Sequence, residues 1–168
     1  MKADLFWIPG PWRGRLAIAS RPRGGDWLDD EASAWRQADI DVVVSLLEND
    51  EASQLDLVGE RQAAEHNSIS FISFPIPDRG VPVSFGDAAS LMTRIADQLD
   101  AGKNVAVHCR QGVGRSGMIA AGVLVTSGSS PEEAMQAVSS ARGAEVPETI
   151  EQRRWMQQLP SRLAVTKS

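Results

Sequence analysis

Cysteine and histidine are scarce in this chain. Its 168 residues include one cysteine, Cys109, and two histidines, His66 and His108. A lone cysteine excludes a disulfide framework, and these side chains are too few for a tetrahedral cysteine and histidine zinc cluster. Any chemistry at the Cys109 thiol must therefore proceed without a second thiol. We expect neither a metal ion nor another cofactor.

Long apolar runs are also missing. The N-terminal run at residues 5–8 and the longest run, residues 118–125, are too short to span a bilayer or to form the core of an export signal. We therefore expect no contact with a membrane. A cytoplasmic location is expected instead, where reducing conditions keep a free thiol available.

The charge balance disfavours one class of partner. The net charge is −5 and unevenly spread, with basic residues dominating 1–25 and eleven acids against one arginine in 26–60. An acidic total argues against nucleic-acid binding, although the basic strip could face an anionic partner. Both blocks are more typical of a solvated surface.

The length and composition are those of one folded domain. Hydrophobic residues make up 42% of the chain and charged residues 23%, both near globular averages. We predict a single catalytic domain over residues 1–164, followed by a short frayed tail at 165–168.

Short apolar runs alternate with helical patterns along the chain. Strands are predicted at residues 16–19, 41–47, 69–74 and 104–108. The run at 42–47 is continuously apolar, as in a strand buried on both faces of a parallel sheet. The pattern predicts an α/β fold, a mainly parallel sheet of about five strands with helices on both faces.

Helix signals occupy the stretches between and after these strands. Moderate patterns lie at 30–38 and 55–66. Caps at Ser84 and Ser130 predict two stronger helices, ending near Gly102 and Gly143. A last helix is predicted at 148–159, with its apolar side chains turned inward and a proline stopping it; these residues are Ile150, Trp155, Leu159 and Pro160.

The most informative segment follows the strand at 104–108. It reads His108-Cys109-Arg110-Gln111-Gly112-Val113-Gly114-Arg115-Ser116-Gly117 and then continues as an apolar helix. Where a strand is followed by a glycine-rich loop and the N-terminus of a helix, several unpaired backbone N–H groups lie close together. Such groups bind anions. The glycines also match the dinucleotide pattern G-x-G-x-x-G, but the strand and acid that this pattern requires do not follow.

The spacing of Cys109 and Arg115 indicates a second kind of chemistry. Six positions apart, they let the loop curl so that its N–H groups and the guanidinium surround one phosphate above the sulfur. The same donors stabilise a thiolate, so we expect Cys109 to be largely ionised at neutral pH. A buried structural cysteine is the alternative, and the charged, glycine-rich surroundings argue against it.

The segment 108–117 resembles the H-C-x-x-G-x-x-R-S-G signature of the protein tyrosine phosphatase superfamily. Residues 74–80 resemble its small dual-specificity type, the kinase-associated phosphatase (cyclin-dependent kinase inhibitor 3) group. The resemblance implies that Cys109 forms a phosphocysteine intermediate, that Arg115 holds the phosphate and that Ser116 donates to the sulfur. It further implies that His108 orients the loop and that substrate binds at Arg110, Gln111, Gly112, Val113, Gly114 and Gly117. For Ser116, helix capping is an alternative.

A departing alkoxide or phenoxide needs a proton, so an acid should follow another strand. Asp78 lies after the strand at 69–74, between proline and glycine, at the family's general-acid position; an ordinary turn aspartate is the alternative. By resemblance, Gln152 positions the attacking water, although a surface glutamine fits as well. The acids just past another strand end could contact substrate or fix Arg115, but a solvated loop is favoured; they are Glu48, Asp50 and Glu51.

Together these features predict a cysteine-dependent protein phosphatase that acts on a phosphoprotein or phosphopeptide, on phosphotyrosine, phosphoserine or phosphothreonine. A phosphoinositide phosphatase and a non-catalytic phosphate-binding adaptor are the alternatives. Substrate preference and oligomeric state stay open at this point.

Overall fold

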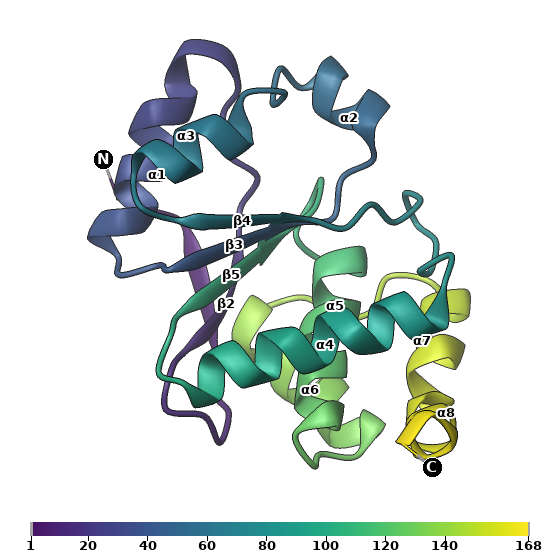
Figure 1. The fold of residues 1–168 in the computed structure, drawn as a ribbon. Helices are drawn as coiled ribbons and strands as arrows, with labels where there is room; N and C mark the ends of the chain where they lie inside the picture. Colours follow the sequence, from purple (N-terminus) through teal and green to yellow (C-terminus); the bar gives the residue numbers. More distant parts are fainter. Residues whose placement is uncertain (1, 168) are drawn as a thin grey trace.

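A five-stranded sheet lies at the centre of the molecule (Figure 1). The computed structural model describes residues 2–167, with side chains through residue 165. The strands lie in the order β1-β2-β5-β3-β4, and all neighbours are parallel except β1 and β2. Their bounds are β1 Leu5–Ile8, β2 Leu16–Ala19, β3 Val42–Ser45, β4 Ser70–Ser73 and β5 Val105–His108. The predicted mainly parallel sheet is confirmed.

Strand β1 is missing from the predicted strands, because a run of four apolar residues does not by itself indicate a strand. It lies at the sheet edge and pairs antiparallel with β2, with Phe6 opposite Ile18. Strand β3 is shorter than predicted and ends at Ser45. The backbone beyond it still follows the sheet, since the Leu46 N–H donates to the His108 carbonyl at 3.0 Å.

Helices cover both faces of the sheet, as predicted (Figure 1). On one face, α1 (Leu28–Gln37) and α3 (Glu60–His66) pack over Val43 and Ala106. The other face packs Val44 and Val107 against helices that include α4 (Phe85–Asp100), α5 (Gly114–Thr126), α6 (Pro131–Arg142), α7 (Ile150–Gln157) and α8 (Leu159–Lys167). Alternate strand residues therefore build two separate cores.

Two helix starts form as the caps predicted. The Ser84 hydroxyl accepts the Asp87 N–H at 3.2 Å to begin α4. The Ser130 hydroxyl accepts the Glu133 N–H at 3.1 Å to begin α6, which ends at Gly143 with a φ of 77°. These local interactions satisfy backbone groups that a helix end leaves unpaired.

The predicted helix at 55–66 was wrong in its first half. Helix α2 covers Asn49–Gln54, and α3 begins only at Glu60. Asp56 takes a left-handed φ of 57°, and its carbonyl accepts the Gly25 N–H at 2.9 Å. This contact with a segment distant in sequence replaces the expected helical turn.

The C-terminal prediction was also wrong in part. Ile150 is 71% exposed at the start of α7, whereas Trp155 and Leu159 are buried as expected. Pro160 lies in the first turn of α8 instead of ending a helix, a position where its missing N–H costs nothing. Helix α8 continues through Lys167, beyond the residue at which a frayed tail was expected, and residue 168 lies outside the described residues.

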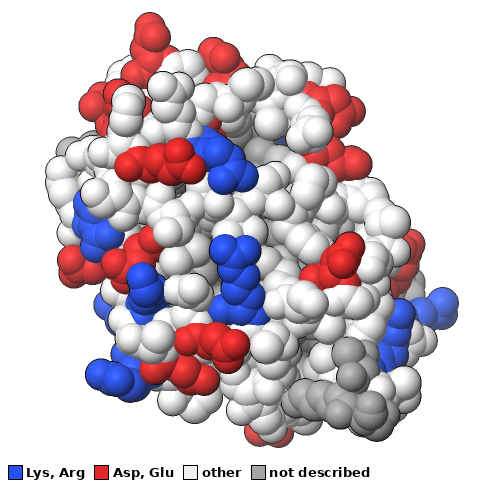
Figure 2. Space-filling model, in the orientation of Figure 1, with Lys and Arg blue, Asp and Glu red and all other residues white. Residues whose placement is uncertain are grey.

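Acidic side chains are unevenly distributed over the surface. Figure 2 shows acidic side chains gathered over the end of the molecule that carries α1, α2 and α3.

Among the described residues, no helix combines the length and apolarity needed to cross a bilayer.

Candidate active site

The loop between β5 and α5 wraps around the Cys109 sulfur. Cys109 is 2% exposed, and its Sγ accepts the Gly112 N–H at 3.3 Å. The carbonyl of that same peptide unit, on Gln111, points away and accepts a hydrogen bond from Arg142 at 3.2 Å. Because a peptide's N–H and C=O point in opposite directions, Arg142 helps to turn this N–H toward the sulfur.

Gly112 is required by the backbone of this loop. Its φ is 71°, a left-handed value that side chains with a Cβ disfavour. Its own carbonyl accepts a second hydrogen bond from Arg142, at 2.8 Å. Arg142 of α6 therefore holds two successive loop carbonyls on the side away from the pocket.

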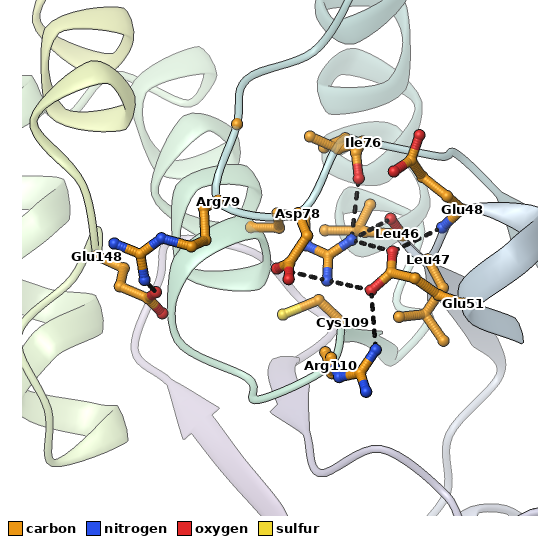
Figure 3. A network of polar contacts seen from close by, with 12 residues as sticks. Leu46, Leu47, Glu48, Glu51, Ile76, Asp78, Arg79, Cys109, Arg110 and Glu148 are labelled. Carbon is orange, nitrogen blue, oxygen red and sulfur yellow. Dashed lines mark hydrogen bonds and ion pairs between the residues drawn. The ribbon is translucent and has the colours of Figure 1, made fainter. Parts of the chain in front are cut away.

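Arg115 lies in the first turn of α5, and its two terminal nitrogens contact several acceptors. Figure 3 labels Glu51, Ile76 and Asp78, which supply some of them. The Arg115 guanidinium is buried, at 2% exposure, and binds both oxygens of Glu51 at 2.7 and 3.0 Å. The same nitrogens reach the Ile76 carbonyl at 2.9 Å and the Asp78 carboxylate at 3.2 Å. A bidentate pair of this kind fixes the plane of the guanidinium as well as its position.

The pair between Glu51 and Arg115 also sets the protonation of both groups. Burial disfavours the Glu51 carboxylate, but the Arg115 hydrogen bonds, the Glu48 N–H and the charges of Arg115 and Arg110 outweigh it and lower the pKa of Glu51. Burial likewise opposes the charge of Arg115, yet Glu51, Cys109 and Asp78 raise its pKa. Both groups are therefore held in their charged forms.

The favoured interpretation of residues 48–51 as a solvated loop was wrong for Glu51. It lies in the first turn of α2 and is only 7% exposed. Arg110 points toward the same carboxylate, at 3.8 Å, instead of into the pocket. The alternative stated from the sequence, that an acid just past a strand end fixes Arg115, is what the structure shows.

Asp78 faces the cysteine from the loop that follows β4. Figure 3 shows its carboxylate close to the Cys109 sulfur, and both line the same cavity. The Asp78 side chain is 56% exposed, so its oxygens are open to solvent and to a ligand. This placement agrees with an acid that protonates a leaving group at the pocket mouth.

His108 is held by a buried acid that sequence reasoning missed. Its Nε2 lies 2.5 Å from a Glu60 oxygen, with both side chains buried, and its ring stacks on Trp35 at 6.1 Å. Its Nδ1 lies 3.5 Å from the Cys109 carbonyl, a long contact of the predicted kind. Glu60 begins α3, far from the motif in sequence, and no local pattern pointed to it.

Ser116 is completely buried, and its hydroxyl has no hydrogen-bond partner among the described residues. The capping alternative is wrong, because Val113 occupies the N-cap of α5 and no side chain caps that end. The predicted donation to the cysteine sulfur is not formed here and stays a prediction. An unsatisfied buried hydroxyl costs about 1–3 kcal/mol, so its presence calls for an explanation, of which a catalytic role is one.

The glycines after Gly112 have different surroundings. Gly114 lines the pocket. Gly117 lies inside α5, where its N–H already donates to the Val113 carbonyl at 3.0 Å and a Cβ would come within 2.3 Å of Val146. The Gly117 N–H is therefore not free to bind substrate, contrary to what the resemblance implies. Close packing against Val146 explains why a glycine stands here.

Gln152 is buried, so the surface alternative for this residue is wrong. Its amide Nε2 donates to the Gly80 carbonyl at 3.0 Å, which ties α7 to the loop that carries Asp78. Gln152 also lines the pocket, so the structure brings it together with Cys109, Arg115 and Asp78.

The resulting cavity is small, about 90 Å³, and lined by polar groups. It is formed by Asp78, Arg79, Cys109, Gln111, Gly114, Arg115, Glu148 and Gln152. Among the described residues, no group of three histidine, cysteine, aspartate or glutamate side chains is arranged to hold a metal ion. The arrangement presents a sulfur nucleophile, a buried cation and an exposed carboxylate to one small space.

The model of the family described as "Polymorphic toxin system, DSP-PTPase phosphatase" matches residues 17–129 of the chain, which include Asp78, Cys109 and Arg115. The chain belongs to this phosphatase family. Members of the dual-specificity and tyrosine phosphatase class are cysteine-dependent hydrolases, which agrees with the site geometry. The match ends before α6, so Gln152 lies outside it.

Similar proteins agree with this family. The chain is 32% identical to cyclin-dependent kinase inhibitor 3 of Rattus norvegicus over 92 residues, which cover 54% of this chain and 43% of the rat protein. It spans less than half of that relative. Kinase associated phosphatase with a serine at its catalytic cysteine superposes with a TM-score of 0.88, at 19% identity over 98% of this chain and 97% of that one.

A second solved structure combines fold likeness with higher sequence identity. Tk-PTP in its active form has a TM-score of 0.77 and 30% identity, covering 95% of this phosphatase and 97% of that chain. The predicted resemblance to small dual-specificity phosphatases is confirmed. In this phosphatase, Glu51 and Glu60 complete the constellation that the motif alone indicated.

Proposed function

We propose that this phosphatase removes phosphate from phosphoproteins, on phosphotyrosine and on phosphoserine or phosphothreonine, without a metal ion. The observation that carries the proposal is the convergence of the Cys109 sulfur, the Arg115 guanidinium and the Asp78 carboxylate on one small cavity. A reducing compartment such as the cytoplasm would keep the single thiol in its reactive form.

The first step transfers the phosphoryl group to the enzyme. The Cys109 thiolate attacks phosphorus, an S–P bond forms and the bond from phosphorus to the leaving oxygen breaks. Asp78, in its protonated form, gives its proton to that oxygen. Arg115 and the loop N–H groups stabilise the charge that develops on the phosphoryl oxygens.

The second step regenerates the enzyme. A water molecule attacks phosphorus, the S–P bond breaks, and the Asp78 carboxylate takes the water's proton. Inorganic phosphate is released, and the Cys109 thiolate is regenerated. Since the net charge of −5 repels a phosphate dianion, attraction must come from the loop, the N-terminus of α5 and Arg115.

The cavity lining supports acceptance of more than one phosphoamino acid. None of its eight described residues is aromatic, so the lining offers no ring to stack on a phenyl group. Selection for phosphotyrosine by stacking is therefore weak. We expect aryl and alkyl phosphates to enter the same site.

Hydrolysis of p-nitrophenyl phosphate in EDTA tests the reaction, with Cys109→Ser as the matched inactive variant. Activity in the wild type and its loss in Cys109→Ser are expected. Phosphate release from phosphotyrosine and phosphothreonine peptides and from inositol phosphates then tests the substrate class. Release from inositol phosphates alone, or peptide binding without release, would contradict the proposal.

A further inference from the structure

The loop that carries Asp78 is fastened to the start of α7. Gln152 donates to the Gly80 carbonyl at 3.0 Å, and the Thr149 hydroxyl donates to the Arg79 carbonyl at 3.5 Å. The Arg79 side chain forms an ion pair with Glu148 (Figure 3). Glu148 and Thr149, just before α7, and Gln152, in its first turn, thus hold the two residues that follow Asp78.

The Gln152 amide is almost fully occupied by these contacts. Its Oε1 accepts the N–H groups of Glu148 and Thr149, both at 3.2 Å, which uses both lone pairs. Its Nε2 donates one hydrogen to Gly80. One amide hydrogen is left, so Gln152 could orient a water only as a single donor. Its hydrogen bond to the Gly80 carbonyl, in contrast, is already formed.

The position of Asp78 depends on its backbone more than on its side chain. The carboxylate is 56% exposed, and it contacts Arg115, the group that a substrate phosphate engages. When a substrate phosphate binds Arg115, it competes with this contact. The backbone contacts at Arg79 and Gly80 then have to keep the acid within hydrogen-bond reach of the leaving oxygen.

We propose that Gln152 is a positioning residue for the general acid Asp78 and acts in the first step, the transfer of phosphoryl to Cys109. The proposal rests on the proposed phosphatase function. It differs from the role implied by resemblance, in which this glutamine orients the water of the second step. Loss of the Gly80 hydrogen bond lets the loop move, and proton donation to the leaving oxygen becomes less effective.

Leaving-group dependence separates the two roles. The ester phenyl phosphate needs the acid more than p-nitrophenyl phosphate does, because phenolate is a poorer leaving group. In Gln152→Leu, we expect kcat/KM for phenyl phosphate to fall about 10- to 100-fold and for p-nitrophenyl phosphate about threefold or less. In an Asp78→Asn background, the further loss from Gln152→Leu should stay below about twofold, because the acid is already gone.

A second variant keeps the test sound if Gln152→Leu folds poorly. Gln152→Glu retains oxygen acceptors for the N–H groups of Glu148 and Thr149 but has no hydrogen to donate to Gly80. The same ratio of losses between the two esters is expected. Ser130→Ala removes a comparable cap at α6, and it should lower the melting temperature while leaving that ratio as in the wild type.

Three results would overturn the positioning role. One is equal loss with both esters in both Gln152 variants. Another is full additivity with Asp78→Asn. The third is a kcat/KM that stays unchanged while kcat falls and phenol is released in a burst. That result would mean that only the second step is slowed, and it would assign Gln152 to the hydrolytic water alone. An inactive wild type, by contrast, would refute the phosphatase function itself, so the two failures are distinguishable.

Discussion

The buried pair of Glu51 and Arg115 gives the sharpest prediction about stability. Replacing Glu51 by glutamine removes one charge but keeps the size of the side chain and one oxygen. Arg115 then stays buried at 2% exposure with only part of its acceptors. An uncompensated buried cation is costly because the protein interior solvates charge poorly.

The magnitude follows from what remains around the guanidinium. Removing one partner of a buried ion pair costs about 3–5 kcal/mol. Arg115 keeps the carbonyls of Leu46 and Ile76 and the Asp78 carboxylate, so we expect Glu51→Gln to lower the free energy of unfolding by about 2–3 kcal/mol. For a chain of this size, that corresponds to a melting temperature about 5–10 °C lower.

The loss should depend on pH in a defined direction. The folded-state pKa of Glu51 is lowered, so its contribution is complete above the ordinary value of 4.5 and disappears as the pH falls through the folded value. Urea unfolding followed by tryptophan fluorescence should therefore show the full difference between wild type and variant at pH 7 and a shrinking one below pH 4.5.

A surface acid provides the matched control. Glu65 is 59% exposed and pairs with Arg61 at 3.8 Å on α3, so Glu65→Gln removes the same charge with an expected effect within about 0.5 kcal/mol. A Glu51→Gln effect as small as that of the control at pH 7, or one that does not change in acid, would refute the reasoning.

Three further outcomes are expected. Asp78→Ala should slow turnover of an alkyl phosphate by about 10²- to 10⁴-fold, and a loss below about tenfold would reassign the acid. Glu60→Leu, which leaves the buried His108 ring without its acid, should lower the unfolding free energy in urea by about 3 kcal/mol and reduce kcat/KM; wild-type values in both assays would contradict this. Peroxide should inactivate the enzyme without forming an internal disulfide, since Cys109 is the one cysteine, and a thiol reductant should restore activity; resistance to peroxide would argue against a reactive Cys109 thiol.

Much of the fold followed from local patterns in the sequence. The caps at Ser84 and Ser130 placed two helix starts correctly, because a capping hydroxyl binds an N–H only three residues away. The continuous apolar run at 42–45 became a strand buried on both faces. The segment from Cys109 to Arg115 indicated the anion-binding loop, since its geometry is set by neighbouring residues.

Errors arose where distant segments decide the local backbone. Asp56 leaves the helix because its carbonyl binds Gly25, a contact that periodicity does not contain. Pro160 lies in the first turn of α8 and does not end a helix, because α7 has already ended at Gln157. Ile150 was expected inside but lies on the surface at the first turn of α7.

The sequence by itself determined the layered α/β fold and the candidate nucleophile, phosphate-binding arginine and acid, because each depends on residues close together in the chain. Only the tertiary structure decided what surrounds them. Glu51 reaches Arg115 across 64 positions of sequence, and Glu60 reaches His108 across 48. Pairing of buried charges depends on which strand ends and helix starts meet in space, and that information is spread over the whole core.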